Sequence, residues 1–156
     1  MDDSTLRGTY IEVEVESVRV SSSTPTQVGE RPVIPKVLIL VEKNTQFGPG
    51  RFLPVWINEY GAESIEIIRQ GVKSPRPVYH DFTKNILDAI GSRVKAVAIV
   101  ALKNDTFFAC TVIELNEKAH YVDCTPSDAV ALAMRAHAPI FVAEDVMSEA
   151  AQPMRK

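Results

Sequence analysis

The chain has 156 residues, of which 46% are hydrophobic and 24% charged, which is enough apolar material for one domain with a hydrophobic core. A membrane-spanning helix needs about 20 apolar residues, and no stretch of the sequence approaches this length. The start, MDDSTLRGTY, lacks the basic and apolar segments of a signal peptide. We therefore expect a cytoplasmic protein without a membrane partner. The net charge of −3 argues against a protein that binds nucleic acid through overall charge alone.

The first third of the chain predicts three strands. Residues 10–20, YIEVEVESVRV, begin with alternating apolar and acidic side chains, which is typical of a half-exposed strand, and the alternation changes phase after Ser17, which predicts a bulge. Residues 21–32 are rich in Ser, Thr, Pro and Gly and predict a polar loop. Two further strands are expected at 36–43 and 51–57, joined by a turn.

Two helices are expected next. Residues 58–71 carry an apolar stripe at helical spacing between Asn58, a favourable N-cap, and Gly71, a favourable C-terminal stop. Residues 72–80, VKSPRPVYH, predict an extended connection because each proline disfavours helix in the residue before it. Residues 81–91 predict a second amphipathic helix. Its core-facing side chains are expected to be Phe82, Ile86, Leu87 and Ile90.

A hairpin and a short strand follow. Residues 94–102 and 106–115 are continuous apolar runs around the turn KND, and they predict a hairpin that is covered on both faces. Residues 119–124 predict a short strand. Cys110 and Cys124 are too far apart for a CxxC pair, so we expect two buried, reduced thiols.

The last part of the chain predicts a buried helix and a strand. From Ala129 to Ala136 nearly every residue is apolar, which is typical of a helix that is buried on most sides, and 138–145 predict a final strand. The core should span about residues 10–147, with a frayed tail at 148–156. The whole chain, 1–156, is therefore expected to form a single α+β domain, in which about three helices pack against a mixed, largely antiparallel sheet.

Three blocks of the sequence are similar to a known family. They are LPVWINEYGAESIEIIRQGVKSPRPVYHDFTKNILDAIG, TFFACTVIE and VDCTPSDAVALAMRAHAPIFVAEDV, and they lie in this order between about Leu53 and Met147. The combination of PRP-x-x-HD, TF-aromatic-A and PSDA-(V/I)-ALA is specific. On these motifs, the chain resembles the bifunctional nuclease domain family.

This resemblance implies a compact α+β domain that self-associates, usually as a dimer, and that cleaves both DNA and RNA. We expect no organic cofactor. Two positions depart from the family's pattern: Tyr79 stands where threonine is common before the His-Asp pair, and Thr125 stands where arginine is common before Pro-Ser-Asp. If that arginine contacts phosphate in relatives, this chain lacks one phosphate contact.

Hydrolysis of a phosphodiester needs an attacking water, a stabilised leaving oxygen and neutralisation of the charge on phosphorus. Proteins meet these needs with three kinds of group. Carboxylates can hold Mg²⁺ or Mn²⁺, and a histidine can transfer protons. Arginines and helix N-termini can bind the phosphate. The candidate catalytic residues are His80, Asp81 and Asp128. The candidate metal ligands are Asp81, Asp123 and Asp128. The candidate phosphate-binding residues are Arg76, Ser127 and Arg135.

Several of these residues have a structural alternative. Thr125 is a favourable N-cap, and a carboxylate at Asp128 in the first turn would stabilise the helix by roughly 0.5–2 kcal/mol. Asp81 can play the same role in the preceding helix. Arg135, on an otherwise apolar helix, can bind phosphate or form an ion pair within the chain or between subunits. Arg76 lies between two prolines, which hold it out on a stiffened segment.

Two functional hypotheses remain open from the sequence. The first is a nuclease with little sequence preference, assisted by a divalent metal; the resemblance and an excess of basic residues between Arg69 and Lys103 support it. The second is a non-enzymatic, self-associating module that binds an anionic ligand or a partner protein, which the negative net charge favours. Trp56, Phe107 and Phe108 are expected in the core, so no aromatic stacking surface is predicted.

Overall fold

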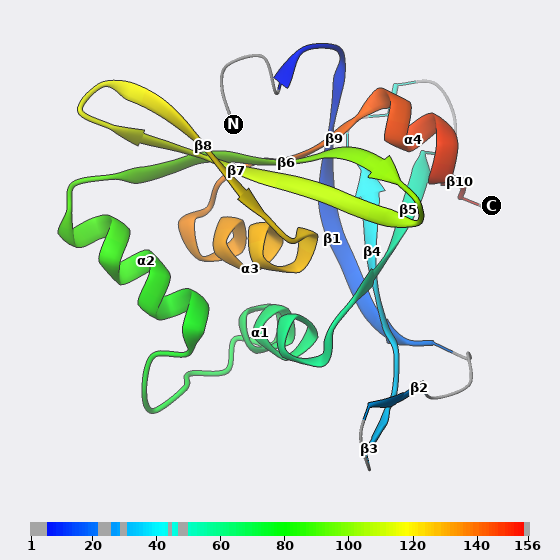
Figure 1. Cartoon of the computed structure of the whole chain (residues 1–156), viewed down its shortest axis with the longest axis horizontal. Coiled ribbons are helices and arrows are strands. Elements are labelled where there is room, and N and C mark those ends of the chain that lie inside the picture. Colours follow the sequence, from blue (N-terminus) through cyan, green and yellow to red (C-terminus); the bar gives the residue numbers. More distant parts are fainter. Residues whose placement is uncertain (1–5, 22–25, 29–30, 44, 47–49, 155–156) are drawn as a thin grey trace.

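The structure is a computed structural model that describes residues 6–21, 26–28, 31–43, 45–46 and 50–154. Its strands are β1 (Tyr10–Val20), β2 (Thr26–Val28), β3 (Arg31–Val33), β4 (Lys36–Glu42), β5 (Arg51–Ile57), β6 (Arg93–Lys103), β7 (Thr106–Leu115), β8 (Lys118–Cys124), β9 (Ile140–Ala143) and β10 (Gln152–Pro153). Its helices are α1 (Glu59–Arg69), α2 (Tyr79–Ala89), α3 (Pro126–Ala136) and α4 (Glu144–Ala150). The predicted single α+β domain is confirmed, with four helices in the described residues where about three were expected (Figure 1).

Eight strands form one mixed sheet in the order β10-β5-β4-β1-β9-β6-β7-β8. Among the strands that the structure describes in this sheet, only β6 and β9 pair in parallel, and the other neighbours pair antiparallel. The short strand β9 joins the two halves of the sheet, because it pairs with β1 on one side and with β6 on the other. The register of β1 against β4 shifts between Val15 and Ser17, which confirms the irregularity that the change of phase predicted.

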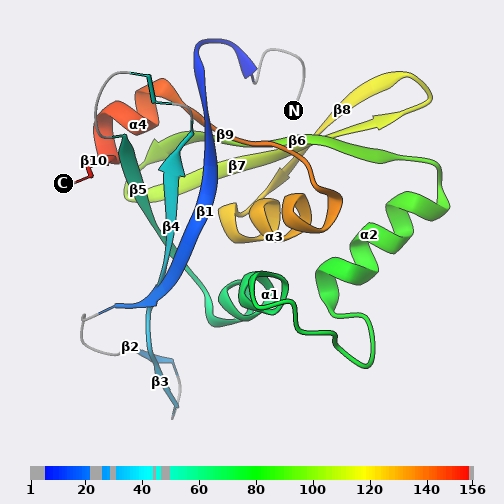
Figure 2. The ribbon, with the colours of Figure 1, turned by 180° about the vertical axis from the view of Figure 1, so that it is seen from behind.

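The helix α3 lies in the middle of the domain. It contacts β6 and β7 on one side and both α1 and α2 on the other, and all three helices lie on the same face of the sheet (Figures 1 and 2). Its residues from Ala129 to Ala133 are buried, which confirms the prediction of a helix enclosed on most sides. The repeated alanines suit this position, since small side chains let neighbouring elements approach closely.

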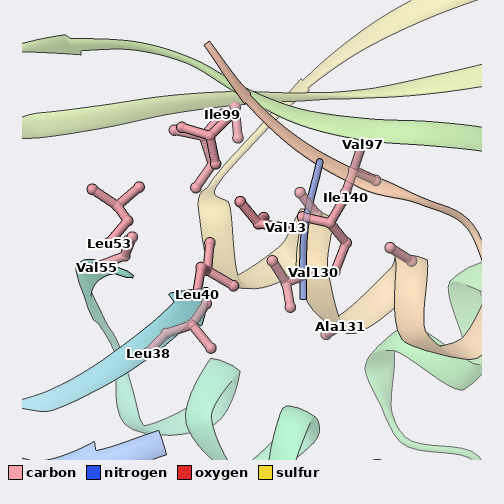
Figure 3. Packing of buried hydrophobic residues seen from close by; sticks show 14 of the residues in the cluster. Val13, Leu38, Leu40, Leu53, Val55, Val97, Ile99, Val130, Ala131 and Ile140 are labelled. Carbon is pink, nitrogen blue, oxygen red and sulfur yellow. The ribbon is translucent and has the colours of Figure 1, made fainter. Parts of the chain in front are cut away.

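The main hydrophobic core lies between α3 and the inner face of the sheet. Leu38 and Leu40 of β4, Leu53 and Val55 of β5, and Val130 of α3 are fully buried and lie around one another (Figure 3). Each such side chain stabilises the fold by about 1.5–3 kcal/mol relative to an exposed position. This core holds α3 against the strands.

The hairpin of β6 and β7 forms as predicted, and Asn104 and Asp105 make its turn with positive φ angles of 48° and 58°. Its outer face is covered only in part, because Cys110 is buried there in a small second cluster whereas Phe108 is exposed. Trp56 is exposed as well. The prediction that these aromatic side chains belong to the core is therefore wrong for two of the three.

The helix α2 differs most from its prediction. It begins at Tyr79, two residues before the expected start. The expectation that its apolar side faces the core is wrong for Phe82, Ile86 and Ile90, which are all exposed, and only Leu87 packs against the main core. The reason is position: α2 lies at the margin of the helical layer and packs mainly against α3, so one of its sides stays open to solvent (Figure 1).

The predicted frayed tail at 148–156 is also wrong for the residues that the structure describes. The helix α4 continues to residue 150, and β10 then pairs with β5. Val146 and Met147 are buried and anchor α4, and Glu144 in its first turn forms an ion pair with Arg51 at 2.7 Å. The final two residues lie outside the described part of the chain.

The predicted polar loop at 21–32 contains the two-stranded hairpin of β2 and β3, so the loop prediction is wrong there. Outside this hairpin, Ser21 is described, and residues 22–25 and 29–30 lie outside the described part of the chain. Among the helices of the described part, none has both the length and the apolar composition to cross a membrane.

The helices α1 and α3 approach each other closely where Gly61 faces Ser127. A Cβ atom at position 61 would lie 2.5 Å from Cβ and 2.6 Å from Oγ of Ser127, which is closer than such atoms can come. Glycine is therefore required by space, and the first turns of both helices lie side by side.

Replacing Gly61 by alanine tests this contact. In an ordinary helix the change would stabilise the protein by about 0.5–1 kcal/mol. Here we expect the free energy of unfolding to fall by about 1–2 kcal/mol, because the new methyl group overlaps Ser127. Urea unfolding measures it, and the double variant Gly61→Ala, Ser127→Gly should recover part of the loss. A single variant that is as stable as the wild type would contradict the close approach.

Candidate functional site

The first turn of α2 is fixed by one carboxylate. Oδ2 of Asp81 accepts a hydrogen bond from the backbone N–H of Val78 at 3.0 Å, which caps the helix, and Oδ1 accepts one from Nε of Arg135 at 2.5 Å. Burial by itself raises the pKa of Asp81, but the hydrogen bonds from Arg135 and Val78 outweigh burial and hold the pKa below its usual value of 3.8. Asp81 is therefore an ionised structural group.

Arg135 joins three helices from inside the protein. Its side chain is only 4% exposed, and besides Asp81 its Nη1 contacts the carbonyl oxygens of Ala131 at 2.9 Å and of Ser64 at 3.3 Å. These partners belong to α3, α2 and α1. Of the alternatives that the sequence left open, the geometry favours the ion pair within the chain, since a buried guanidinium is not free to meet phosphate.

A second polar network lies next to this pair. His80 is flanked by Ser64, whose Oγ lies 2.7 Å from Nδ1, and by Asp128, whose Oδ1 lies 3.0 Å from Nε2. Ser64 is buried and the imidazole is mostly buried, but the Asp128 side chain is 52% exposed. The network thus runs from the interior of α1 through the first turn of α2 to a carboxylate in contact with solvent.

The chemistry of these groups fixes the direction of the hydrogen bonds. An ionised carboxylate only accepts, so Nε2 of His80 donates to Asp128. In the neutral imidazole Nδ1 is then an acceptor, and the hydroxyl of Ser64 donates to it. Asp128 therefore selects one tautomer of His80, and Ser64, whose hydroxyl can donate or accept, donates to the remaining ring nitrogen. The prediction of site residues missed Ser64, although a hydroxyl on the apolar side of the helix between Ala62 and Ile65 was a visible signal.

Asp128 has a capping role as well. Its backbone N–H donates to Oγ1 of Thr125 at 3.3 Å, which confirms Thr125 as the N-cap of α3, and its Oδ2 accepts from the same hydroxyl at 2.8 Å. The carboxylate thus has one oxygen on Thr125 and the other on His80. Both roles that the sequence allowed for Asp128 are compatible, because a half-exposed carboxylate has acceptor positions left.

His80 and Asp128 line a solvent-open cavity of about 430 Å³. Asn58 and Gly61 of the first turn of α1 line it too, so the N-terminal ends of α1 and α3 both lie at this cavity. Helix N-termini carry partial positive charge and bind anions. The cavity therefore combines a histidine, a carboxylate and two positive helix ends.

Cys124 also lines this cavity, and its Sγ lies 3.4 Å from Oγ1 of Thr111. Burial raises the pKa of the Cys124 thiol, so it stays protonated at neutral pH and is a poor nucleophile. Burial raises the pKa of Cys110 to about 11. Both thiols are free; Cys110 is buried as predicted, whereas Cys124 is half-buried.

The remaining predicted residues do not lie in the cavity lining. Ser127 is buried beneath α1 against Gly61. Asp123 is exposed on β8 between two residues that line the cavity, and since side chains alternate along a strand, it points to the opposite face. Arg76 is exposed in the segment before α2 and forms no ion pair with any residue that the structure describes.

The predicted three-carboxylate metal site does not form. Asp81 is held by Arg135, Asp123 lies on the other face of β8, and Asp128 contacts His80. No group of three or more His, Cys, Asp or Glu side chains within the described ranges is arranged to hold a metal ion. The donor set therefore does not fit a metal held by these acids.

Replacing Asp81 by asparagine tests the structural pair. At pH 7 we expect the free energy of unfolding to fall by about 3 kcal/mol, since Arg135 stays buried without its counter-charge. Folding lowers the pKa of Asp81, so the difference in free energy of unfolding between the wild type and the variant has its full size above the unfolded pKa near 3.8. The difference shrinks as the pH falls through the pKa of the folded state. Urea unfolding at several pH values measures it. The control Asp123→Asn should change stability little, and equal losses in both variants would refute the role of the pair.

Comparison with known proteins agrees with the sequence motifs. Residues 38–155 match the model of the family described as bifunctional nuclease domain. The uncharacterized protein Rv1829 of Mycobacterium tuberculosis is 38% identical over 139 residues, which cover 89% of this chain and 75% of that protein. Bifunctional nuclease 2 of Arabidopsis thaliana is 28% identical over 98 residues, which cover 61% of this chain and 30% of that protein. With a match across most of its length, the chain belongs to the bifunctional nuclease domain family.

Proposed function

We propose that this protein is a nuclease that hydrolyses phosphodiester bonds of DNA and RNA with little sequence preference. The observation that carries the proposal is the contact of His80 with Asp128 at 3.0 Å in a solvent-open cavity beside two helix N-termini. Membership of the bifunctional nuclease domain family supports the same reaction class. The two free thiols favour a reducing compartment, and we place the protein in the cytoplasm.

The roles of the residues follow from their exposure and contacts. The phosphodiester lies against the positive ends of α1 and α3, which offset the negative charge that builds on phosphorus. A water attacks phosphorus, and its proton passes to the His80–Asp128 pair, whose exposed oxygen atoms belong to Asp128. The pair then returns a proton to the leaving oxygen. Ser64 donates to Nδ1 and holds the imidazole in place, and Arg76 contributes an exposed positive charge near the start of α2.

Metal dependence is a separate part of the proposal. We expect Mg²⁺ or Mn²⁺ to assist hydrolysis, but the acids named from the sequence do not form a metal site, so none of the steps above depends on a metal ion. The dependence is measured directly, by comparing cleavage with Mg²⁺, with Mn²⁺ and with a chelator.

The central test is cleavage of short single-stranded DNA and RNA by matched variants. His80→Ala and Asp128→Asn should each lower the cleavage rate by about 10²–10⁴-fold, the usual effect of losing a proton-transfer group. His120→Ala is the control, because His120 is exposed on β8 outside the cavity lining. Melting curves exclude unfolding as the cause. If both cavity variants cleave at the wild-type rate, the proposed site is wrong.

A second candidate function is a non-enzymatic module that self-associates and binds an anionic ligand or a partner protein. The exposed apolar side of α2, formed by Phe82, Ile86 and Ile90, favours it, because contiguous exposed apolar surface is typical of protein interfaces. We propose that a second copy of the chain packs on Ile86 and Ile90 of this side and forms a homodimer.

Charge placed on α2 tests self-association. Ile86→Lys together with Ile90→Lys should convert dimers to monomers in sedimentation equilibrium, because two charges would be buried without partners. Ile34→Lys is the matched control, since Ile34 is an exposed isoleucine outside α2. Equal masses for the wild type and the α2 variant would show that this side is not the interface. Cleavage by a monomeric variant would separate the two functions.

A further inference from the structure

A second hollow lies beside the His80–Asp128 cavity. Its volume is about 420 Å³, and residues of α1, of the segment before α2 and of the first turn of α2 line it. Most of this lining is apolar: Ile67, Pro77 and Val78 contribute to it, and Glu63 is its one charged residue. Such a hollow suits a neutral, largely apolar group and disfavours an anion.

Three aromatic side chains stand around this hollow with their rings in solvent. Tyr60 is 76% exposed, Tyr79 is 79% exposed and Phe82 is 60% exposed. Aromatic side chains are normally buried in large part, so three exposed rings around one hollow are unusual in a folded domain. Exposed rings offer flat faces on which another ring can stack.

The hollow and the His80–Asp128 cavity share part of their walls. Tyr60 and Tyr79 line both. Ser64, whose hydroxyl contacts His80, lines the apolar hollow, whereas His80 itself lines the neighbouring cavity. A molecule that fills both therefore places a flat uncharged part against the aromatic rings and a second part beside His80 and the two helix N-termini, where an anion is favoured.

A nucleotide unit within a nucleic acid strand has this composition, because a neutral aromatic base is joined through the sugar to a charged phosphate. We propose that the apolar hollow is a base-binding subsite, in which Tyr60, Tyr79 and Phe82 stack on an unpaired nucleobase of a single strand. The adjacent phosphodiester is thereby held at the His80–Asp128 cavity. Stacking requires an unpaired base, since a base within a duplex has both faces covered by its neighbours. This inference rests on the proposed nuclease function for the identity of the ligand.

The stacking residues lie on rigid elements. Tyr60 belongs to the first turn of α1, and Tyr79 and Phe82 belong to the first turn of α2, whose start is capped by Asp81. Every base presents a flat face, so stacking at this position is tolerant of sequence. The subsite therefore predicts a preference for single strands over duplexes without a strong preference among bases.

The test measures binding apart from cleavage. A fluorescent 12-nucleotide single strand is titrated with protein, and anisotropy gives the Kd for the wild type and for the double variant Tyr60→Ala, Tyr79→Ala. We expect the Kd to rise between about 5-fold and about 100-fold, the range for loss of stacking on one or two rings. The pair Tyr60→Phe, Tyr79→Phe keeps both rings and should bind as the wild type does.

Two controls identify the occupant. Trp56→Ala removes an exposed aromatic side chain from β5, outside both cavities, and should leave the Kd unchanged. A strand with abasic sites in place of bases should bind the wild type and the double alanine variant equally weakly. Sedimentation of each variant checks whether a second copy of the chain occupies the hollow; a change of mass in the alanine variant would overturn the proposal.

Failure of this subsite is distinguishable from failure of the proposed function. If the wild type cleaves and the alanine variant binds intact strands as tightly as the wild type, the subsite is wrong and the nuclease proposal stands. If the alanine variant loses affinity for intact strands but the wild type cleaves nothing, the subsite stands and the nuclease proposal fails. Absence of binding by the wild type overturns the subsite.

Discussion

The buried ion pair between Arg135 and Asp81 is the contact on which the arrangement of the helices depends. Arg135 is almost fully enclosed, and it is stable there because a carboxylate from α2 and carbonyl oxygens from α1 and α3 surround it. Asp81 also caps α2, so the same carboxylate determines where that helix begins and where His80 lies. Ser64 takes part in both networks, since its carbonyl contacts Arg135 and its hydroxyl contacts His80. The candidate site is thus built directly on the structural pair.

Much of the fold was predictable because local rules decide it. The alternation in β1, the Asn58 and Thr125 caps, and the buried helix α3 all follow from side chains within a few residues of one another. The errors have a common cause in tertiary position. The apolar pattern of α2 identifies which side is apolar but not whether anything covers it, and Phe82 and Ile86 remain exposed at the margin of the domain. The tail was assigned as frayed although Val146 and Met147 provide an anchor for α4.

The candidate site was predictable only in part. The motifs identified His80 and Asp128, but 48 positions separate them in sequence, so their contact depends on the packing of α2 against α3. Asp81 and Asp128 hold similar first-turn positions, yet one turns inward to Arg135 and the other stays exposed, a difference that no local pattern contains. Asp123 was assigned to the metal site, but its neighbours Val122 and Cys124 both line the cavity. Because successive side chains of a strand point to opposite faces, Asp123 points away from the cavity.

The position of β9 has a consequence for the order in which the domain can assemble. The strands β6, β7 and β8 form a local meander, and β1, β4 and β5 form a second group, but only β9 bonds to both. During synthesis the two groups can therefore form early and separately, whereas the continuous sheet must wait for residues 140–143. The elements that α3 contacts, α1, α2, β5, β6 and β7, all precede it in the chain, so α3 can dock before the sheet is joined. A ribosome-bound chain that ends before β9 would hold every residue that lines the His80–Asp128 cavity but two groups of strands that are not yet joined into one sheet.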